Sequence, residues 1–528
     1  MPYQFSLPTP GPLLLQSCLS SPSHPQLPYH ATTARHALRV ALKRYKKATK
    51  SQRQNELLKA RDAVEQYLNW LVAVIEGAEY DLGRESCSSR AQVEIHQEIE
   101  AAWTPVLFSS KTRIPHIPTS LRSKSSPTGS GSGRTSGSER VKHPGFAYEL
   151  AFTLTTYAFI LSNLARSRYL HTLYASHTPT PAERTTALQL SIRDLQLAAS
   201  IHAYISTSPF FASLNGGSNN SCPPDVQLTA QSGLKSLCLA EATLLSIAKD
   251  DGYLFACIQL RNERDTEWMI KAPDIPRVRT LLFARICVRA AELASEAEGA
   301  MMAAAAAVAP SPSSATDKSS GIIGYVSVLA RVARARACRF FGIEAEDSER
   351  TGEGIAWLRA GGECLMAGGR RRSSNGGHDV GKEKEKSRLG FRKWKDDWKE
   401  RREEKKLEKG AGEGEGGPDS GDGLIAGDDA GRMEELRVSE WLSAKWEKMN
   451  NTVNTQRIPP HGPLLSQLPS GRDILPPLKV YVPECLDKDR IESLRGAGVS
   501  PESAGMGFDG DELGSSSEEE EEIVRDYF

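Results

Sequence analysis

The sequence predicts an all-α protein, an irregular antiparallel array of helices interrupted by polar segments. Several segments of about 20–35 residues repeat apolar side chains at helical spacing, and no segment alternates apolar and polar residues as a half-buried strand would. The apolar fraction is 39%, while the 528 residues include 43 Gly and 30 Pro, so part of the chain is expected to be linker or tail. No known helical repeat recurs at a fixed period, which is why the array is expected to be irregular.

Two helices are expected near the N-terminus, after a proline-rich opening segment. In "ATTARHALRVALKRYKKATK", Thr32 or Thr33 can cap a helix that carries Leu38 and Leu42 on one face. A longer helix is expected over residues 55–79, where apolar side chains recur every three or four positions.

The most apolar stretch of the chain, "YELAFTLTTYAFILSNLA" at 148–165, is either a membrane span or a buried helix. A span needs about 20 mostly apolar residues. This stretch is shorter, includes Glu149 and contains several Thr, Ser and Asn residues. A helix that is apolar nearly all round lies at the centre of a larger helical domain, so we expect a central buried helix.

Further helical patterns follow this stretch. The first of them begins with a proline in its first turn, a position that suits proline because the first amides of a helix have no intrahelical partner. The sequence after about residue 456 is rich in proline and is expected to be extended. The helical patterns cover residues 180–205, 223–251, 276–309, 324–346 and 351–368, and a last one begins at 433.

The domain organisation follows from composition. We expect one helical domain over residues 1–483, with mobile insertions at 110–142 and 368–432, and a disordered acidic C-terminal tail at 484–528. The first insertion is rich in Ser, Gly and Arg, and the second is charged and rich in Gly.

The second insertion contains a possible polar helix at about 388–409, which permits two interpretations. The simpler one is a solvated insertion, given its composition. The alternative is a weak patch for anionic lipids, because Phe391, Trp394 and Trp398 stand among lysines and arginines. The acidic residues between them count against the second interpretation.

Charge and cysteine content exclude several functional classes. Lys and Arg number 66, as do Asp and Glu, so the chain lacks the basic excess of a nucleic-acid-binding domain. The nine cysteines form no CxxC pair and lie at no zinc spacing, which favours a reducing compartment. The N-terminal segment has no basic region and is broken by prolines, so no secretory signal is expected. We expect a soluble cytoplasmic protein.

No catalytic motif is present in the sequence. A P-loop, a paired-glycine dinucleotide motif and an HExxH pair are all missing, and the histidines are scattered. We therefore expect no enzyme activity and predict no catalytic, cofactor-binding or metal-binding residues. An enzyme whose site is assembled from distant residues remains an alternative.

Several segments carry a family resemblance. The stretch at 148–165 resembles the characteristic helix of the BRO-domain family (Alix-like), an aromatic residue and Glu followed by an apolar run that ends in Ser and a small residue. The positions that match this pattern are Tyr148, Glu149, Leu154, Ser162 and Ala165.

The same family is suggested by four shorter segments. "AAWTPVLF" at 101–108, "LCLAEATLL" at 237–245 and "GEGIAWL" at 352–358 resemble other motifs of the family, and "MNNTVNTQRIPP" at 449–460 stands where the family has its Asn-containing, then Pro-containing exit segment. "RSRYLHTLYASHTPTPAERT", "EWMIKAPDIPRVRTLLFAR" and "PSGRDI" are similar to segments of the PalC-type pH-response regulators of filamentous fungi, a divergent subgroup.

The resemblance implies a curved, elongated helical domain with tetratricopeptide-like packing that acts as an adaptor. Family members bind the amphipathic C-terminal helix of the filament-forming core subunit of ESCRT-III. PalC-type proteins thereby link ESCRT assemblies at the cell cortex or endosome to an alkaline-pH cascade. That cascade ends in proteolytic activation of a transcription factor. The resemblance also implies that the protein associates with membranes peripherally, through its partners. Other components of the pH pathway are possible partners as well.

The family's groove for that helix is implied to lie in "LLSIAKDDGYLFACIQL". A groove between helices accepts the apolar face of an amphipathic helix. Here Ser246 and Ile247 occupy positions where the family often has an aromatic pair. The groove residues implied by the resemblance are Leu245, Ile247, Lys249, Leu254, Phe255 and Ile258.

Two alternatives stand beside this interpretation. The apolar positions could belong simply to the core, and Lys249 could be only solvated. The protein could also be a helical scaffold of another endosomal or trafficking complex with a different peptide partner, for example through "LPSGRDILPPLKVYVP", a proline-rich ligand for another module.

Overall fold

The computed structural model describes residues 2–49, 51–83, 91–108, 140–175, 179–215, 222–259, 279–308, 321–366 and 429–495. Most of the two predicted insertions, including the aromatic residues considered for lipid binding, lies outside these residues, and so does the tail beyond residue 495.

Long helices dominate the described chain, as the sequence predicts. They are α1 (Leu27–Lys47), α2 (Arg53–Gly77), α3 (Phe146–Leu173), α4 (Pro181–Thr207), α5 (Leu228–Ala248), α7 (Thr280–Val308), α9 (Ile322–Asp347), α10 (Thr351–Met366) and α12 (Arg432–Met449). Short helices are α6 (Gly252–Gln259), α13 (Gly462–Ser466) and α14 (Lys488–Ser493), with 3-10 turns at Leu15–Ser17, Pro209–Asn215 and Pro224–Val226 and a π turn at Asn450–Asn454.

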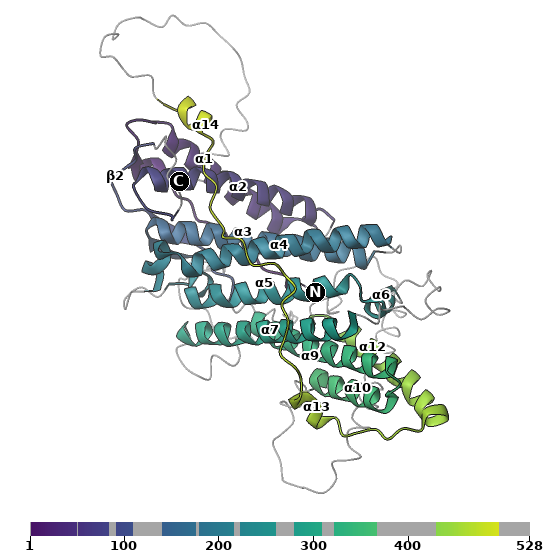
Figure 1. Ribbon diagram of the computed structural model, residues 1–528. Helices are drawn as coiled ribbons and strands as arrows, with labels where there is room; N and C mark the ends of the chain where they lie inside the picture. The colour runs from purple at the N-terminus through teal and green to yellow at the C-terminus, as the bar shows by residue number, and fades with distance from the viewer. Residues whose placement is uncertain are drawn as a thin grey trace, which may run out of the picture. The chain divides into compact units, whose positions relative to one another are not determined.

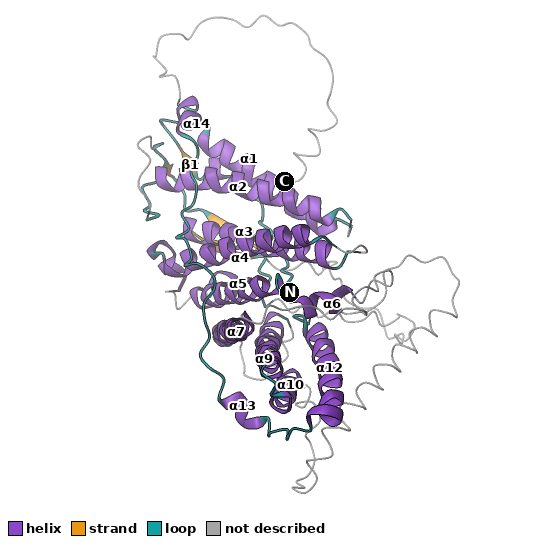
Figure 2. Ribbon diagram, turned by 45° about the vertical axis from the view of Figure 1, so that its right-hand side comes forward, coloured by secondary structure: helices purple, strands orange, loops and turns teal. Residues whose placement is uncertain are grey.

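The helices pack side by side in chain order. α1 contacts α2, and the series continues through α3, α4, α5, α7 and α9 (Figures 1 and 2). α12 leaves this order because it packs against both α9 and α6. The predicted all-α array is confirmed, and its core runs continuously from the first helices to α12.

α3 is the central buried helix expected from its apolar sequence. It follows Gly145, whose φ of 95° suits glycine, and Phe152 and Phe159 are fully buried. The hydroxyls of Thr153 and Thr156 each donate to the carbonyl four residues earlier, so these polar side chains are satisfied inside the core. No helix in the described part of the chain is long and apolar enough to cross a membrane.

Two short antiparallel ribbons correct the expectation that the chain has no strands. β1 (Leu19–Ser20) pairs with β2 (Glu94–Ile95), and β3 (Glu100–Trp103) pairs with β4 (Val141–Pro144). Strands this short carry too few residues for an alternating pattern to be visible. β4 also begins inside the segment predicted as a loop at 110–142.

The start of α1 differs from the sequence-based expectation. The helix begins at Leu27 with Pro28 in its first turn, so neither Thr32 nor Thr33 is the cap. The Thr32 hydroxyl instead donates to the Pro28 carbonyl at 2.8 Å and accepts from the Leu15 amide at 3.0 Å. α4, by contrast, has the expected proline in its first turn, together with a capping box formed by Thr180 and Glu183.

A buried ion pair links the first helices, and we call it the Glu149 cluster (Arg35, Tyr67, Trp103 and Glu149). The Glu149 carboxylate accepts from Arg35 Nε at 2.8 Å, Tyr67 Oη at 2.8 Å and Trp103 Nε1 at 2.7 Å. Burial favours the neutral acid, but the Arg35 guanidinium outweighs it and holds the pKa of Glu149 below its ordinary value. The cluster therefore joins α1, α2, β3 and α3 through one carboxylate.

The proline-rich segment at 467–487, which we call the strap, crosses the helices from α13 to α14 (Figure 1). Gly471 lies so close to α7 that a Cβ at this position would be 2.5 Å from the Cα of Arg289. The structure describes the chain past the expected domain boundary at Pro483, and Leu486 and Ile491 are buried in the core. The helical domain thus includes α14.

Candidate helix-binding site

The candidate site lies at the corner between α5 and α6. α5 ends at Ala248, and Lys249 is its C-cap residue. Asp251 then caps α6, because its side chain accepts from the Leu254 amide at 3.1 Å and its carbonyl accepts from the Phe255 amide at 3.1 Å. The sequence "AKDDGYLF" therefore turns sharply and starts a new helix at Gly252.

A second buried ion cluster fixes this corner, and we call it the Arg339 cluster (Asp251, Arg336, Arg339 and Glu435). The Arg339 guanidinium donates to both oxygens of Asp251, at 3.1 and 2.5 Å, and its Nε donates to Glu435 at 2.6 Å. Arg336 Nε donates to Glu435 at 3.1 Å. The cluster therefore connects the start of α6 to α9 and α12.

The charges of the Arg339 cluster stabilise one another away from water. Burial raises the pKa of Asp251, but the Arg339 guanidinium outweighs burial and the net pKa is lowered. Burial also lowers the pKa of Arg339, while Asp251 and Glu435 raise it by a larger amount. Neighbouring opposite charges thus favour the charged forms of Asp251 and Arg339 despite their burial.

The structure brings four of the six predicted groove residues into one apolar cluster. Leu245, Leu254 and Ile258 are buried at its centre, and Phe255 packs at its edge. The opposite wall consists of side chains from α3 and α4. These are Ala165, Tyr169 and Leu173 of α3 and Leu188 and Leu195 of α4.

The remaining predicted residues lie apart from this cluster. Ile247 is fully buried in the main core. Lys249 is exposed and forms no salt bridge with a described residue. Phe255 is half-buried, with the Arg184 guanidinium 4.1 Å from the centroid of its ring. Among the predicted groove residues, only Lys249 and Phe255 are therefore accessible to a partner.

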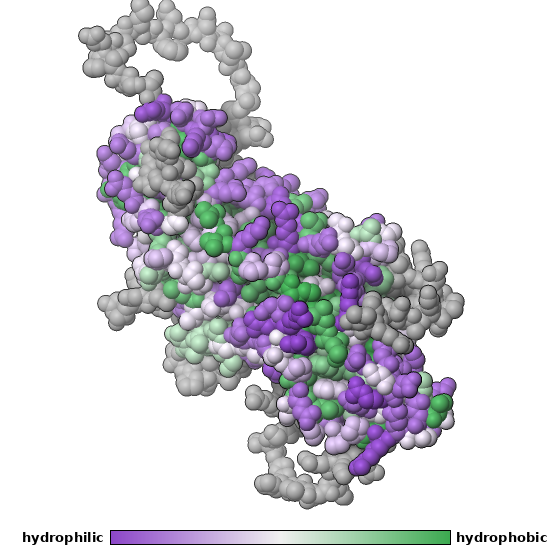
Figure 3. Space-filling model, in the orientation of Figure 1, coloured by the Kyte–Doolittle hydropathy of each residue, from purple (hydrophilic) through white to green (hydrophobic). Residues whose placement is uncertain are grey.

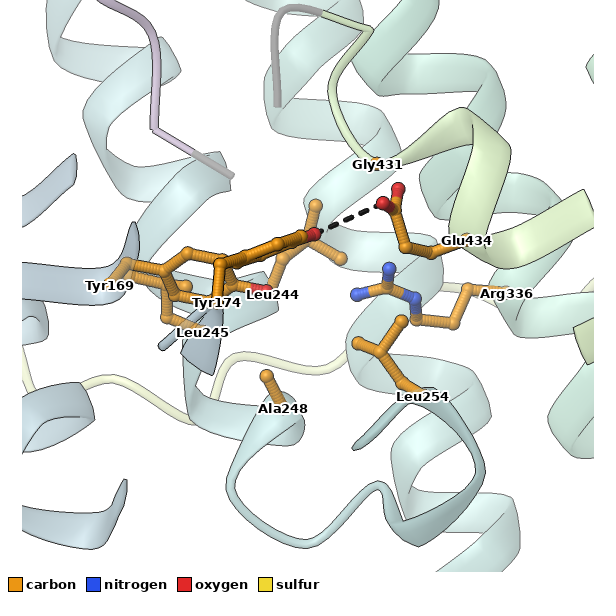
Figure 4. Close-up of a pocket in the computed structure, with 9 residues that line it drawn as sticks. All are labelled: Tyr169, Tyr174, Leu244, Leu245, Ala248, Leu254, Arg336, Gly431 and Glu434. Carbon is orange, nitrogen blue, oxygen red and sulfur yellow. Dashed lines mark hydrogen bonds between the residues drawn. The ribbon is translucent and has the colours of Figure 1, made fainter. Parts of the chain in front are cut away.

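A small pocket lies beside this corner (Figure 4). The Tyr174 hydroxyl donates to Glu434 at 3.0 Å across one side of it. The volume open to the centre of a water molecule is about 10 Å³, which holds about one water. The lining residues are Tyr169, Tyr174, Leu244, Leu245, Ala248, Leu254, Arg336, Gly431 and Glu434.

The pocket is too small for a metabolite, so it offers no substrate site as it stands. Its charged wall is already occupied by the Arg336 contact to Glu435. Within the ranges that the structure describes, no group of three His, Cys, Asp or Glu side chains could hold a metal ion.

Sequence reasoning missed the Arg339 cluster. Asp251 and Glu435 lie 88 and 96 residues from Arg339 along the chain, and no local pattern connects them. A usable signal was "RARACRFF", in which Arg336 and Arg339 stand among Ala, Cys and Phe residues, since an arginine on the apolar face of a helix needs a buried partner.

Comparisons with known proteins identify a relative of nearly full length. No protein-family model matches the sequence. The pH-response regulator protein palC of Emericella nidulans is 43% identical over 522 residues, which cover 97% of this chain and 95% of palC. This similarity confirms the predicted relationship to PalC-type regulators.

Three solved structures also align with the chain. The complex of the ALIX BRO1 domain with CHMP4C has a TM-score of 0.47 at 11% identity and covers 92% of this chain and 97% of that one. ALIX with the SIVmac239 PYKEVTEDL late domain has a TM-score of 0.46 at 12% identity, covering 92% and 49%. The Bro1 domain described for endosomal targeting has a TM-score of 0.41 at 15% identity, covering 94% and 95%. On the sequence identity to palC, the chain belongs to the family of the palC pH-response regulators.

Proposed function

We propose that the protein is a non-catalytic adaptor in ambient alkaline-pH signalling. It binds the amphipathic C-terminal helix of the ESCRT-III core subunit and so couples ESCRT assemblies, at the cell cortex or the endosomal membrane, to the proteolytic activation of a transcription factor. The observation that carries this proposal is the 43% identity to palC over nearly the whole of both chains.

The α5–α6 corner is the proposed contact for that helix. An amphipathic helix presents apolar side chains at i, i+3, i+4 and i+7, and the half-buried ring of Phe255 offers them an apolar surface. The ring packs against the buried side chains of Leu245, Leu254 and Ile258, which do not contact the partner themselves.

Charge at the corner favours a partner helix with acidic residues beside its apolar row. Lys249 is exposed, Arg184 is half-buried on the Phe255 ring, and neither forms a salt bridge with a described residue. Asp250 beside them is already paired with Arg279 at 3.3 Å. Unpaired cations at the rim of an interface set orientation and association rate.

The test uses the full chain and a synthetic peptide of the ESCRT-III core subunit's C-terminal helix, with affinity measured by fluorescence anisotropy. Phe255→Ala is expected to weaken binding by about 10- to 100-fold because it removes the apolar contact. Lys249→Glu is expected to weaken it by about tenfold and to reduce its salt dependence.

Lys445→Glu is the matched control, since Lys445 is an exposed lysine on α12 and its reversal should leave affinity unchanged. Ile258→Asp is unsuitable as a test because Ile258 is buried and a charge there would damage the fold. The proposed contact is wrong if the wild-type chain does not bind the peptide, or if both corner variants bind as the control does.

A further inference from the structure

The strap has an exposure pattern that repeats every three residues. In "RDILPPLKVYVP" (472–483) the side chains of Leu475, Leu478 and Tyr481 turn toward the helices. Val480, between Leu478 and Tyr481, is 86% exposed, and Ile474, just before Leu475, is 44% exposed. A repeat of three is the period of the polyproline II helix, which has three residues per turn.

Backbone chemistry agrees with that assignment from Pro476 onward, after the bend in the backbone at Leu475. Pro476, Pro477 and Pro483 fix their own φ near the polyproline II value, and each restricts the residue before it to extended conformations. The backbone of residues 474–482 forms no hydrogen bond with the rest of the described chain, as expected for a helix without internal hydrogen bonds.

One edge of this helix is anchored to the array. Leu475 packs against the apolar cluster under the α5–α6 corner, and Leu478 and Tyr481 pack against the main core. The Tyr481 ring meets the Tyr204 ring edge-on, with centroids 5.8 Å apart. The anchored edge keeps the strap in one conformation before any partner arrives.

The start of the strap is fixed separately, on α7. The Arg472 amide donates to the Arg285 carbonyl at 3.1 Å, and Arg289 Nε donates to Asp473 at 2.8 Å. One end of the strap is bonded to α7 and its inward edge packs against the core. The segment has therefore already lost conformational entropy in the free protein.

The other two edges face solvent and are mostly apolar. The first carries Pro477 and Val480, both exposed. The second carries Pro476, Lys479 and Val482, where Val482 is 49% exposed and Lys479 forms no salt bridge with a described residue.

The face that carries the strap shows apolar surface between hydrophilic regions (Figure 3). A segment that only tied helices together would need one apolar edge and could carry polar residues on the other two. An exposed apolar ridge on a rigid segment indicates an interaction site.

We propose that the outer edges of the strap are a docking site for a partner with an SH3-type groove, which is lined by aromatic side chains and flanked by acidic ones. Such grooves bind polyproline II segments through two edges of the ligand, while its third edge points away. In this protein the third edge is the one already packed against the helices, so docking needs no rearrangement and little further ordering. Lys479 supplies the cation that an acidic flank would contact.

The experiment measures binding of the full chain to a panel of purified SH3 domains by surface plasmon resonance. At least one domain is expected to bind the wild-type chain, and Val480→Asp is expected to weaken that binding at least about tenfold. Lys479→Glu is expected to weaken it several-fold and to reduce its salt dependence.

Matched controls are available on other elements. Val453→Asp changes a valine that is 74% exposed in the π turn, and Lys445→Glu changes an exposed lysine of α12; both should bind as the wild type does. Neither strap variant should alter the unfolding temperature or the affinity for the ESCRT-III helix peptide, which separates this site from the α5–α6 corner.

The proposal is overturned if no SH3 domain of the panel binds, or if Val480→Asp and Val453→Asp bind equally well. If Lys479→Glu leaves the affinity unchanged, the inference that the partner's groove is flanked by acidic side chains is wrong. Binding by WW domains with none by SH3 domains would also overturn the assigned class of partner.

Discussion

The Glu149 cluster and the Arg339 cluster both place guanidinium–carboxylate pairs in the interior, but they join different parts of the chain. In the first, the Glu149 carboxylate of α3 receives hydrogen bonds from Arg35 of α1, Tyr67 of α2 and Trp103 of β3. In the second, two arginines of α9 hold Asp251 and Glu435, which lie 184 residues apart.

This difference separates two uses of the same chemistry. The Glu149 cluster depends on a single ion pair, so loss of either charge leaves the other buried without compensation. The Arg339 cluster has a second guanidinium, and it fixes the positions of α6 and α12 relative to α9. We therefore expect the first cluster to govern global stability and the second to govern the α5–α6 corner.

The largest effect is expected from Glu149→Gln, which strands the buried Arg35 charge. Unfolding in urea should show a loss of about 3–5 kcal/mol. Glu98→Gln is the control, since Glu98 is exposed and should change stability by less than about 0.5 kcal/mol. A loss at Glu149 no larger than that of the control would refute the single-ion-pair interpretation.

Arg339→Met is expected to reduce stability somewhat less, by about 3–4 kcal/mol, because Arg336 still compensates Glu435. Hydrogen exchange should lose protection mainly in α6 and α12, while α1 to α3 keep theirs. Uniform loss of protection along the chain would show that the two clusters do not differ in the way proposed.

A further buried carboxylate, Glu241, sharpens the comparison because no guanidinium of a described residue donates to it. It accepts from the Tyr3 amide at 2.7 Å and from the Tyr325 hydroxyl at 2.9 Å, and burial raises its pKa to about 7. Between the ordinary value of 4.5 and about 7, the folded state keeps a proton that the unfolded state releases. Stability therefore falls as pH rises through that window.

The expected loss is up to about 3 kcal/mol, since one pKa unit corresponds to about 1.4 kcal/mol. Unfolding curves at several pH values should show Glu241→Gln equal to wild type near pH 4.5 and more stable above pH 7. The difference between the two proteins isolates Glu241 from Asp225, whose pKa burial also raises, to about 6. A pH-independent difference would contradict the raised pKa.

The smallest effect is expected at an uncharged fixed point, Gly471 of the strap. A Cβ there would lie 2.5 Å from the Cα of Arg289, so Gly471→Ala should push the strap off α7 and reduce stability by about 1–3 kcal/mol. Limited proteolysis should then cut within 467–487, while Gly462→Ala, at a site with open space, should not promote cleavage. Equal resistance of the two variants would show that the close approach is not needed.

The fold could be predicted largely from periodicity and composition, because long helices leave a signal in every turn. The apolar run of α3 indicates a buried helix without reference to any other segment. The same pattern assigns Glu149 no role beyond interrupting a possible membrane span. Its partners at positions 35, 67 and 103 become neighbours only after the chain folds.

The candidate site could be predicted less well, for a related reason. α5 is buried on most of its circumference, so its apolar positions carry no local signal that separates core from surface. Leu245, Ile247, Leu254 and Ile258 are all buried. Lys249 and Phe255 differ from them only through the bend that Asp251 makes possible.

The end of the strap has a consequence for the protein's synthesis. α14 lies against the beginning of the chain, where the Arg490 guanidinium is 5.3 Å from the ring centroid of Trp70. Leu486 and Ile491 are buried in the same core as the N-terminal helices. The apolar surface that they cover is therefore synthesised early and is covered only when the end of the chain has been made. At a translation rate of roughly 5–20 residues per second, the helix that contains Trp70 waits on the order of half a minute for α14. During that time the nascent chain offers a chaperone an apolar surface that the finished protein no longer shows.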